Sequence, residues 1–439
     1  EFPFQVHVPR EKNKNQKTLE LLAPAGNLLK LKTALAHGAD AVYLGIPDFS
    51  LRVRINDFDI KGIKEAIIYA HSLNKKVYIT TNIFAHNKHL DAFISYLKKI
   101  KDFKPDAFIA ADPGIISLIK KYAKGIDIHL STQANCTNLE SARFWQEQGV
   151  SRVVLGREVT LSEIKKIHRA LPNLELEYFV HGAMCMAYSG RCFLSKLFVG
   201  RSGNLGDCAQ PCRWQYDTSR YMVKARGHKE ELELVEERHG TYLLNSYDLC
   251  LVRELPELIK AGVMSFKIEG RAKSVYYQAI VSSIYRRALT LVDKIKDREK
   301  LKKELDYLYK ELATKLVHRG YTTGFLKEEK AGQNIENAKE ESDYEFCGQV
   351  VDSSSLKDEK KLPKNAVIFQ VHNTILTGDN LEIVLPGFEV IKMKLKHLYD
   401  VKSGEEISEA HGGGGSRRAY IILKDKFIPM FSVIARKIK

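Results

Sequence analysis

Short apolar runs alternate with segments of helical periodicity from Leu19 to Val292 of this 439-residue chain. Strands buried on both faces of a parallel sheet read as continuous apolar runs, and strands separated by helices indicate βαβ units. Eight such units close into a barrel, so the sequence predicts an α/β protein with a (β/α)8 TIM-like barrel. The predicted strands are Leu19–Ala25, Ala41–Ile46, Lys76–Asn82, Ala107–Asp112, Ile126–Asn135, Arg152–Glu158, Leu174–Gly182 and Ser265–Gly270.

The predicted helices repeat apolar residues at the period of an α-helix. A last barrel helix is expected at Ser274–Val292, followed by a charged helix at Asp297–Lys315 that packs outside the barrel with Glu304 and Lys310 toward solvent. The other predicted helices are Asn27–His37, Ile60–Leu73, His89–Lys101, Ile115–Tyr122, Leu139–Gln148 and Leu161–Ala170.

The connection between the seventh and eighth strands is far longer than the usual few residues. It holds the cysteine loop 183–213, then a predicted hairpin around Tyr221–Lys224 and Glu231–Val235. A helix is expected to begin near Ser246 or Asp248 and to end at Ala261. Long inserts at the face of a barrel where its strands end are more often functional than accidental.

The composition changes after the barrel domain, for which we predict residues 19–327. Residues 328–343 read as a mobile linker, and 344–411 read as a small antiparallel β-barrel domain with turn signals between short strands. The polar start, 1–18, reads as an N-terminal arm. Residues 412–439 begin with Gly-Gly-Gly-Gly-Ser, typical of an engineered linker, and were expected to form a linker and tail.

Polar residues occur where the predicted strands end, which is the face that carries the chemistry in such barrels. Glu158, Glu269 and Lys267 are candidate catalytic acid–base groups, with a structural ion pair as the alternative. Arg157 and Arg271 are candidates for binding an anion. The remaining polar residues at this face are Glu20, Tyr43, Asn82, Asp112, Ser131, Thr132, Gln133 and His181.

Four of the seven cysteines lie in the loop at this face, with the spacing C-x6-C-x15-C-x3-C: Cys185, Cys192, Cys208 and Cys212. Structural zinc usually shows paired C-x2-4-C knuckles, and only the second pair approaches that spacing. Iron–sulfur clusters tolerate wider and uneven spacings. The pattern favours an iron–sulfur cluster, with zinc or unmetallated thiols as alternatives.

The other three cysteines have weaker claims to a metal. Cys250, expected in the first turn of a helix, is an alternate fourth ligand, although Leu249, Val252 and Leu255 suggest that it faces the core. Cys136 is predicted to pack in the interior, and Cys347 begins a strand of the second domain without thiol neighbours in sequence.

The formal charge of +15 favours a polyanionic partner, RNA before membrane, although lysine-rich helices also simply keep a surface soluble. The chain shows no apolar run long enough for a membrane span and no export leader. We therefore expect a cytoplasmic protein without a membrane partner, and reduced thiols agree with that setting.

The stretch from Glu177 to Ser195, E-x-F-x-x-G-A-M-C-x4-G-x-C-x-L-S, resembles the signature of the collagenase-like peptidases of family U-32. The resemblance extends from Leu19 to about Ser408. Other matching segments are Leu22–Asn27, Gly38–Tyr43, Ser131–Gln133, Gly156–Glu158, Lys267–Arg271 and Arg319–Gly324.

The resemblance implies more than proteolysis, because the family includes tRNA and rRNA hydroxylation proteins. The presence of both Cys208 and Cys212 is most similar to the tRNA hydroxylation branch. That branch implies a [4Fe-4S] cluster held by the four loop cysteines. It also implies oxygen-independent conversion of wobble uridine to 5-hydroxyuridine, with prephenate implicated as hydroxyl source.

Substrate-binding candidates follow from this reading. Arg191, Arg201 and Arg213 suit a small dicarboxylate such as prephenate, while Gln133, Arg157, His181 and Arg271 surround the mouth. His181 has a simpler role in orienting the loop. Tyr188, Trp214 and Tyr216 are candidates for stacking an extruded base, with loop packing as the alternative.

Two other functions stay open. A collagenase-like peptidase would need a nucleophile, and His181 with Cys185 is a conceivable pair, but His-Glu-x-x-His and Gly-x-Ser-x-Gly motifs are absent. A cluster-bearing partner subunit of a hydroxylase complex is the third possibility, and homo- or hetero-oligomers are compatible with both.

Overall fold

The computed structural model describes the barrel, the inserted loop and the second domain in separate stretches. The described residues are 19–46, 48–50, 57–185, 187–188, 191–192, 194–214, 245–327, 341–352, 362–363, 365–412, 417–423 and 426–439, with the backbone of 222–224 and 231–233. The N-terminal arm and most of the predicted linker lie outside them.

Eight parallel strands close into a barrel within the described residues, as predicted. The last strand, β11, pairs with β7 on one side and with β1 on the other, which completes the ring. The barrel strands are β1 (Glu20–Pro24), β2 (Ala41–Leu44), β3 (Lys76–Thr81), β4 (Ala107–Ala110), β5 (Asp127–Leu130), β6 (Arg152–Val154), β7 (Glu175–Ala183) and β11 (Val263–Ile268).

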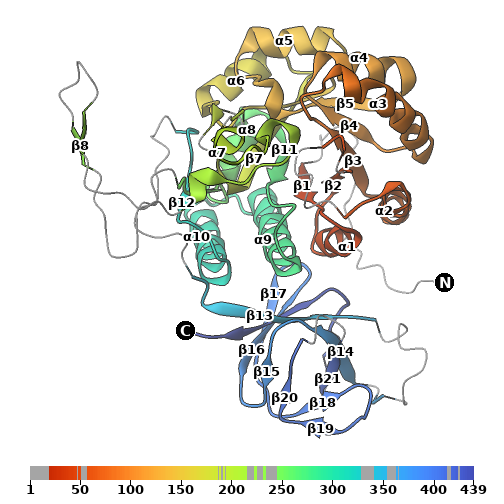
Figure 1. Cartoon of the computed structure of the whole chain (residues 1–439). Coiled ribbons are helices and arrows are strands. Elements are labelled where there is room, and N and C mark those ends of the chain that lie inside the picture. Colours follow the sequence, from red (N-terminus) through yellow and green to blue (C-terminus); the bar gives the residue numbers. More distant parts are fainter. Residues whose placement is uncertain are drawn as a thin grey trace.

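Helices surround this ring and seal its outer surface (Figure 1). They begin at side-chain caps such as Asn27, Asp59 and Thr160, whose oxygens accept amide hydrogen bonds from the first turn. The helices are α1 (Leu28–Ala36), α2 (Ile60–Ser72), α3 (Asn87–Ile100), α4 (Pro113–Tyr122), α5 (Leu139–Glu147), α6 (Leu161–Ala170), α8 (Leu255–Ala261), α9 (Val275–Lys294) and α10 (Arg298–Lys315).

Two apolar clusters lie on the two sides of the barrel wall. The large cluster fills the space between strands and helices, and a small one inside the ring contains Leu22, Tyr43, Tyr78 and Ile109. The alternation of side chains along each strand produces this division. None of the described helices combines the length and apolarity needed to cross a membrane.

The insert between β7 and β11 corrects one sequence expectation. The region predicted as a helix from Ser246 or Asp248 contains a strand, β10 (Asp248–Cys250), and α8 begins only at Leu255. β10 runs antiparallel to the end of β7 and pairs on its other side with β12 (Tyr321–Thr322). The prediction failed because the apolar residues around Cys250 face a tyrosine-rich interior, and a short buried strand and a helix look alike in such a run. The insert also contains α7 (Leu194–Val199) and the predicted hairpin, β8 (Met222–Lys224) with β9 (Glu231–Glu233).

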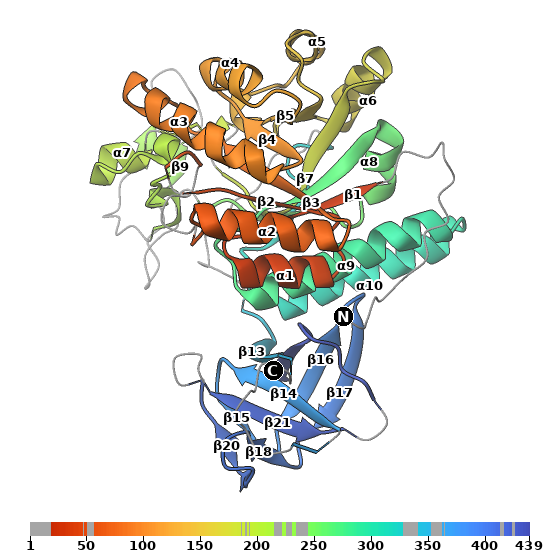
Figure 2. The ribbon, with the colours of Figure 1, turned by 90° about the vertical axis from the view of Figure 1, so that its right-hand side faces the viewer.

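The second domain is an antiparallel β structure packed beneath α1, α9 and α10 (Figure 2). Its large sheet has the order β17-β16-β22-β13-β14-β21-β18-β19, and β15 and β20 form a separate pair. The strands are β13 (Tyr344–Val350), β14 (Ala366–Val371), β15 (Ile375–Leu376), β16 (Asn380–Leu385), β17 (Glu389–Lys394), β18 (Leu398–Asp400), β19 (Glu406–Ile407), β20 (Glu409–Ala410), β21 (Arg418–Ile422) and β22 (Val433–Lys437).

The expectation of a separate tail after residue 411 was wrong. β22 lies in the middle of the sheet, paired with β16 and β13, and β21 pairs with β14. The carbonyl oxygen of Phe431 also lies 2.9 Å from Nε2 of the buried His37 of the barrel. The glycine run hid this continuity, because its composition is that of a linker whatever follows it.

Candidate functional site at the barrel mouth

The cysteine loop is tied to the carboxyl ends of the barrel strands, where the strand order predicted it. The Arg191 guanidinium donates two hydrogen bonds, of 3.1 and 2.8 Å, to the Gln133 carbonyl oxygen after β5. It also lies 5.1 Å from the ring centroid of Phe84, after β3. The Asn204 carbonyl oxygen accepts a 3.4 Å bond from the Phe84 amide. The loop therefore covers the mouth and is fixed to it by these contacts.

A glycine allows β7 and β11 to meet closely beneath this roof. Gly182 has a φ of +107°, and a Cβ there would lie 2.5 Å from the Glu269 carbonyl oxygen. The Glu269 amide donates a 2.8 Å hydrogen bond to the His181 carbonyl oxygen next to it. A side chain at Gly182 would push the start of the cysteine loop away from β11.

Two loop thiols accept hydrogen bonds from backbone amides two residues further on. The Leu194 amide donates to Cys192 Sγ at 3.4 Å, and the Gln210 amide donates to Cys208 Sγ at 3.3 Å. A Cβ at Gly203 would be 3.7 Å from Cys208 Sγ and 3.8 Å from the Cys192 carbonyl oxygen, so these two residues flank the same glycine. Amide donors of this kind stabilise thiolates and tune bound clusters.

The other two thiols belong to the same neighbourhood. Burial raises the pKa of Cys212, Arg213 and Arg319 oppose that rise, and Cys185 and Cys208 lie near enough to add to it. Cys185 is exposed, and the other three loop cysteines are partly buried. Among the residues that the structure describes, no three Cys, His, Asp or Glu side chains are arranged as metal ligands. The loop thus supplies four soft thiols, two of which accept backbone amide hydrogen bonds.

Cys250 is a different kind of thiol. It lies in β10 and not in a helix, is 2% exposed, and has its sulfur 3.9 Å from the Tyr285 hydroxyl. Burial raises its pKa to about 12, so it stays protonated at neutral pH. Cys136 and Cys347 are equally buried, each with a pKa raised by burial to about 12. Cys250 therefore has the surroundings of a core thiol.

Sequence reasoning missed a buried ionic network below the mouth. Arg152 donates to Glu20 at 2.5 Å, to Glu175 at 2.7 Å and to Glu177 at 3.1 Å, and Lys267 donates to Glu177 at 2.6 Å. Glu20 begins β1 and pairs in register with Ser265, so it lies at the amino end of the barrel and not at the mouth as expected. The sequence did carry a signal for this network, because charged residues occur within otherwise apolar strands.

Lys267 belongs to this network, which bears on its candidate role as an acid–base group. Its side chain is buried, ion-paired with Glu177, and lies over the ring of Tyr43 at 4.6 Å. Lys and Glu held in this way act as fixed charges that shape the field at the mouth. The two other candidates, Glu158 and Glu269, are partly exposed at strand ends, and the Tyr43 hydroxyl donates to Glu269 Oε2 at 3.5 Å.

Two predicted substrate-binding residues carry buried polar atoms without hydrogen-bond partners in the described structure: Arg157 Nε and Gln133 Oε1. The Arg157 guanidinium lies 3.8 Å from the ring centroid of Phe179, and the Gln133 backbone is fixed by Arg191. A buried polar atom without a partner costs about 1–3 kcal/mol, so such atoms need an explanation. A bound ligand supplies one.

The remaining predicted binding residues, Arg271, Arg201 and His181, have three different environments. Arg271 is buried at the mouth and donates to Thr80 Oγ1 at 3.2 Å and Ser50 Oγ at 3.4 Å. Arg201 is ion-paired with Asp207 at 3.0 Å and stabilises the loop itself. His181 is 2% exposed and packs against the rings of Tyr277, Tyr285 and Tyr321. Burial lowers its pKa to about 3, so the enclosed ring is neutral at neutral pH.

The structure adds two cations that sequence reasoning did not select. Arg319 donates to both oxygens of Asp248, at 2.6 Å to Oδ1 through Nη2 and at 3.2 Å to Oδ2 through its amide. Lys273 is partly buried, and burial lowers its pKa against the pull of Asp248, while Arg213 and Arg319 lower it further. Asp248 is therefore ion-paired with Arg319 and influenced by Lys273 and by Arg213, the residue after Cys212. Only folding brings these residues together, because they come from distant parts of the chain.

An exposed apolar and aromatic surface covers the outside of the loop. Leu197, Phe198 and Trp214 are 78%, 52% and 37% exposed, and the rings of Phe198 and Trp214 are 6.3 Å apart. Tyr188, another predicted stacking residue, is 53% exposed. Tyr216 lies outside the described residues. We call Tyr188, Leu197, Phe198 and Trp214 the aromatic rim.

The barrel with its cysteine loop and the β domain after it match two models of one family. The model of peptidase family U32 covers residues 26–336, and the model of the family's C-terminal domain covers residues 342–429. The chain belongs to peptidase family U32.

Curated relatives within this family have different names. The chain is 37% identical to the tRNA hydroxylation protein P of Haemophilus influenzae, over 90% of this chain and 91% of that protein. It is 31% identical to the 23S rRNA 5-hydroxycytidine C2501 synthase of Escherichia coli, over 84% of this chain and 56% of that protein. It is also 31% identical to the collagenase of Porphyromonas gingivalis, over 63% of this chain and 66% of that protein.

Proposed function

We propose that this protein hydroxylates RNA, with uridine of tRNA at the wobble position as its substrate. Support comes from the relative named for tRNA hydroxylation, whose match covers nearly the full length of both chains. The relative named for rRNA hydroxylation carries much sequence outside its match, so it is the weaker guide. The observation at the site that carries the proposal is the pair of buried, unpartnered atoms at the mouth, Gln133 Oε1 and Arg157 Nε.

A nucleobase suits these two atoms. Gln133 Oε1 accepts a hydrogen bond and Arg157 Nε donates one, so together they match a base edge that offers both an N–H and a carbonyl. Uracil presents that combination at N3–H and its neighbouring oxygens. Enzymes that modify a base at ring carbon draw it out of its stack into a pocket of this kind.

The aromatic rim supports recognition of unstacked bases. Base–aromatic stacking is worth about 1–3 kcal/mol per base and is tolerant of sequence. Trp214 is held by a 3.2 Å hydrogen bond from its indole nitrogen to the Ala209 carbonyl oxygen, which leaves the ring at the surface beside Phe198. Nearby Arg213 supplies positive charge for phosphate.

We assign Cys185, Cys192, Cys208 and Cys212 as ligands of a [4Fe-4S] cluster. Four soft thiol donors in one loop and amide hydrogen bonds to two of the sulfurs support this assignment, and Arg213 and Arg319 favour an anionic group. Bound there, the cluster would supply the redox or Lewis-acid chemistry that side chains lack. Zinc is the alternative occupant of the same thiols.

The cations beside Cys212 suit a small dicarboxylate as hydroxyl donor, and prephenate has that chemistry. Arg213, Lys273 and Arg319 all lie near the carboxylate of Asp248. Guanidinium groups bind carboxylates with two parallel hydrogen bonds, which also fixes orientation. We also propose Glu269, partly exposed after β11, as the group that holds or moves a proton at its Oε2 atom.

The substrate is tested by mass spectrometry of tRNA from a deletion strain complemented with this protein. Wild-type protein is expected to restore 5-hydroxyuridine-derived nucleosides at the wobble position, and Arg157→Ala is expected to restore less than about a tenth, since one lost charged hydrogen bond is worth roughly 1.5–3 kcal/mol. Unchanged nucleosides with wild-type protein would remove tRNA as the substrate. The same digests scored for rRNA hydroxycytidine test the second RNA.

The cofactor is tested by anaerobic purification with analysis of iron, sulfide and zinc. We expect about four irons and four sulfides per chain, as a [4Fe-4S] cluster contains, and a loss of both in Cys208→Ala. One tightly bound zinc per chain would contradict the assignment.

The peptidase alternative rests on the collagenase relative and on the pairing of His181 with Cys185. The structure weakens that pairing, because His181 is buried among tyrosines with its pKa lowered to about 3. Gelatin cleavage that Cys185→Ala abolishes and iron removal leaves unchanged would reinstate proteolysis.

A further inference from the structure

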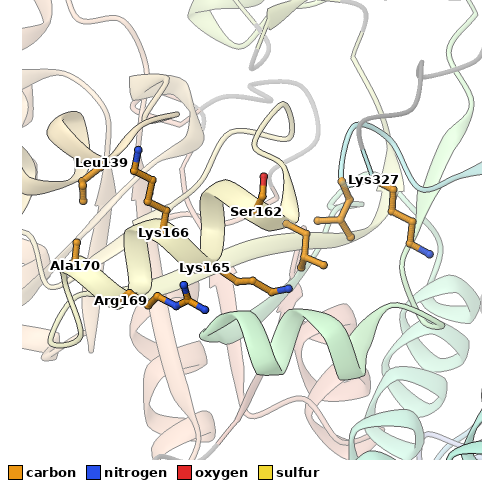
Figure 3. A pocket seen from close by; sticks show the side chains of 9 residues that line it. Leu139, Ser162, Lys165, Lys166, Arg169, Ala170 and Lys327 are labelled. Carbon is orange, nitrogen blue, oxygen red and sulfur yellow. The ribbon is translucent and has the colours of Figure 1, made fainter.

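A hollow lined by apolar and cationic side chains lies on the flank of the barrel (Figure 3). It has a volume of about 870 Å³ and is formed by α6, the first residue of α5 and the segment at Leu326 and Lys327. Leu139 and Leu326 contribute apolar surface, and four cations line it: Lys165, Lys166, Arg169 and Lys327. We call it the flank groove. None of the candidate residues at the mouth lines it.

The charge of the flank groove is one-sided. Lys165, Lys166 and Arg169 are exposed on α6, and within the described residues they make no ion pair. Lys327 is paired with Glu254 at 3.1 Å. The α6 carboxylate of Glu163 is engaged in capping, where it accepts hydrogen bonds of 2.8 Å from the Thr160 amide and hydroxyl. The groove thus presents an excess of positive charge over an apolar floor.

One chain segment connects this groove to the cysteine loop. Arg319 is bonded to Asp248 beside Cys212, and a Cβ at Gly324 would lie 3.5 Å from the Met184 side chain, next to Cys185. The Leu326 carbonyl oxygen accepts a 3.0 Å hydrogen bond from the Leu161 amide at the start of α6. Residues 319–327 therefore link the cysteine loop to the start of α6, with one cation at each end, Arg319 and Lys327.

We propose that the flank groove binds the phosphodiester backbone of the RNA substrate outside the nucleotide held at the mouth. The inference rests on the proposed RNA substrate and adds to it a second, sequence-independent contact region. Lys and Arg on one face neutralise phosphates and release counterions, which gives affinity without base readout. Such a contact adds affinity for the part of a large folded RNA that lies outside the mouth.

The test compares two triple variants that remove the same charge. Lys165→Ala, Lys166→Ala and Arg169→Ala together empty the groove of its α6 cations. Lys99→Ala, Lys302→Ala and Lys303→Ala remove three exposed lysines from α3 and α10, outside the groove. Alanine keeps all three helices favourable, so both variants should fold. Circular dichroism and urea unfolding verify this.

Binding of full-length tRNA is measured by fluorescence anisotropy over a range of salt concentrations. The groove variant is expected to bind at least tenfold more weakly near 0.1 M salt, and the slope of log K against log salt should fall by about 2–3, one unit per lost phosphate contact. The control variant should lose less than about threefold. Equal losses in the two variants would overturn the inference, because they would reflect overall charge alone.

A short single-stranded oligonucleotide separates this inference from the proposed function. It reaches the mouth but not the flank groove, so wild type and the groove variant should bind it equally. If wild-type protein binds neither RNA, the proposed RNA substrate fails. If wild type binds and modifies tRNA while the groove variant matches the control, only the flank groove fails.

Discussion

The charged groups inside the barrel and two polar groups at its mouth differ in whether they have partners. Inside, Arg152 contacts three carboxylates and Lys267 is a second cation paired with Glu177, so each of these buried charges has a partner. At the mouth, Arg157 Nε and Gln133 Oε1 are buried with no hydrogen-bond partner among the described residues. Arg152 and Arg157 are only five positions apart in the chain.

The difference separates structural charge from functional charge. A buried network in which each ion is paired specifies how strands pack, and breaking it leaves an uncompensated charge. An unpartnered polar atom costs stability and is retained where a ligand completes it. The interior network should therefore control folding, and the mouth should control activity.

The largest expected effect is on stability, from Arg152→Met. The variant leaves Glu20 and Glu177 buried with one cation between them, so the free energy of unfolding should fall by about 3–5 kcal/mol. Urea unfolding followed by circular dichroism measures it. Arg157→Met is the matched control and should cost less than about 1 kcal/mol, since its guanidinium mainly stacks on Phe179. Similar losses in the two variants would erase the distinction between the regions.

Acid should destabilise the interior next. Burial raises the pKa of Glu177, but Lys267 and Arg152 outweigh it and leave the pKa below its usual value of 4.5. A carboxylate whose folded pKa is lowered stabilises the fold above about pH 4.5 and loses that contribution as the pH falls. Unfolding free energies measured from pH 6 to pH 3 should fall more steeply for wild type than for Glu177→Gln. Parallel slopes would contradict the pairing.

Most of the fold was predictable because the barrel strands appear as continuous apolar runs and the helices repeat apolar residues at the helical period. Helix α6 matches its predicted bounds at both ends, Leu161 and Ala170, since Thr160 caps it and Glu163 completes the capping box. The strand β10 and the tail strand β22 were missed. Both are short runs whose identity depends on a partner strand distant in sequence, which local periodicity does not record.

The site was predictable in part for the same reason. Cysteine spacing and strand ends identified the loop, Gln133 and Arg157 from local pattern. Arg319 and Lys273 were missed because Asp248 and Cys212 become their neighbours only in the folded chain. His181 followed the strand-end rule but turned inward, since three tyrosines provide an aromatic enclosure that the sequence alone did not reveal.

Gln133→Leu tests the mouth from the opposite direction. Leucine removes a buried acceptor that has no partner, so stability should change by less than about 1 kcal/mol. If the acceptor meets the substrate base, its loss should lower RNA hydroxylation at least tenfold. The two measurements are unfolding free energy and nucleoside mass spectrometry on the same preparation. Full activity in the variant would mean that the unpartnered oxygen has no role in recognition.

The smallest expected effect compares two thiols on either side of the same boundary. Cys250 contacts Tyr285 in a buried, protonated state, so Cys250→Ala should lower the free energy of unfolding by about 1 kcal/mol and leave bound iron unchanged. Cys212→Ala should instead lower bound iron and leave the free energy of unfolding nearly unchanged, because its thiol lies in the loop beside Cys185 and Cys208. Iron analysis and urea unfolding of both variants decide between them. Loss of iron in Cys250→Ala would identify Cys250 as the fourth ligand. A buried residue of the interior would then take part in binding the cofactor, and the distinction between a closed barrel and a reactive mouth would fail.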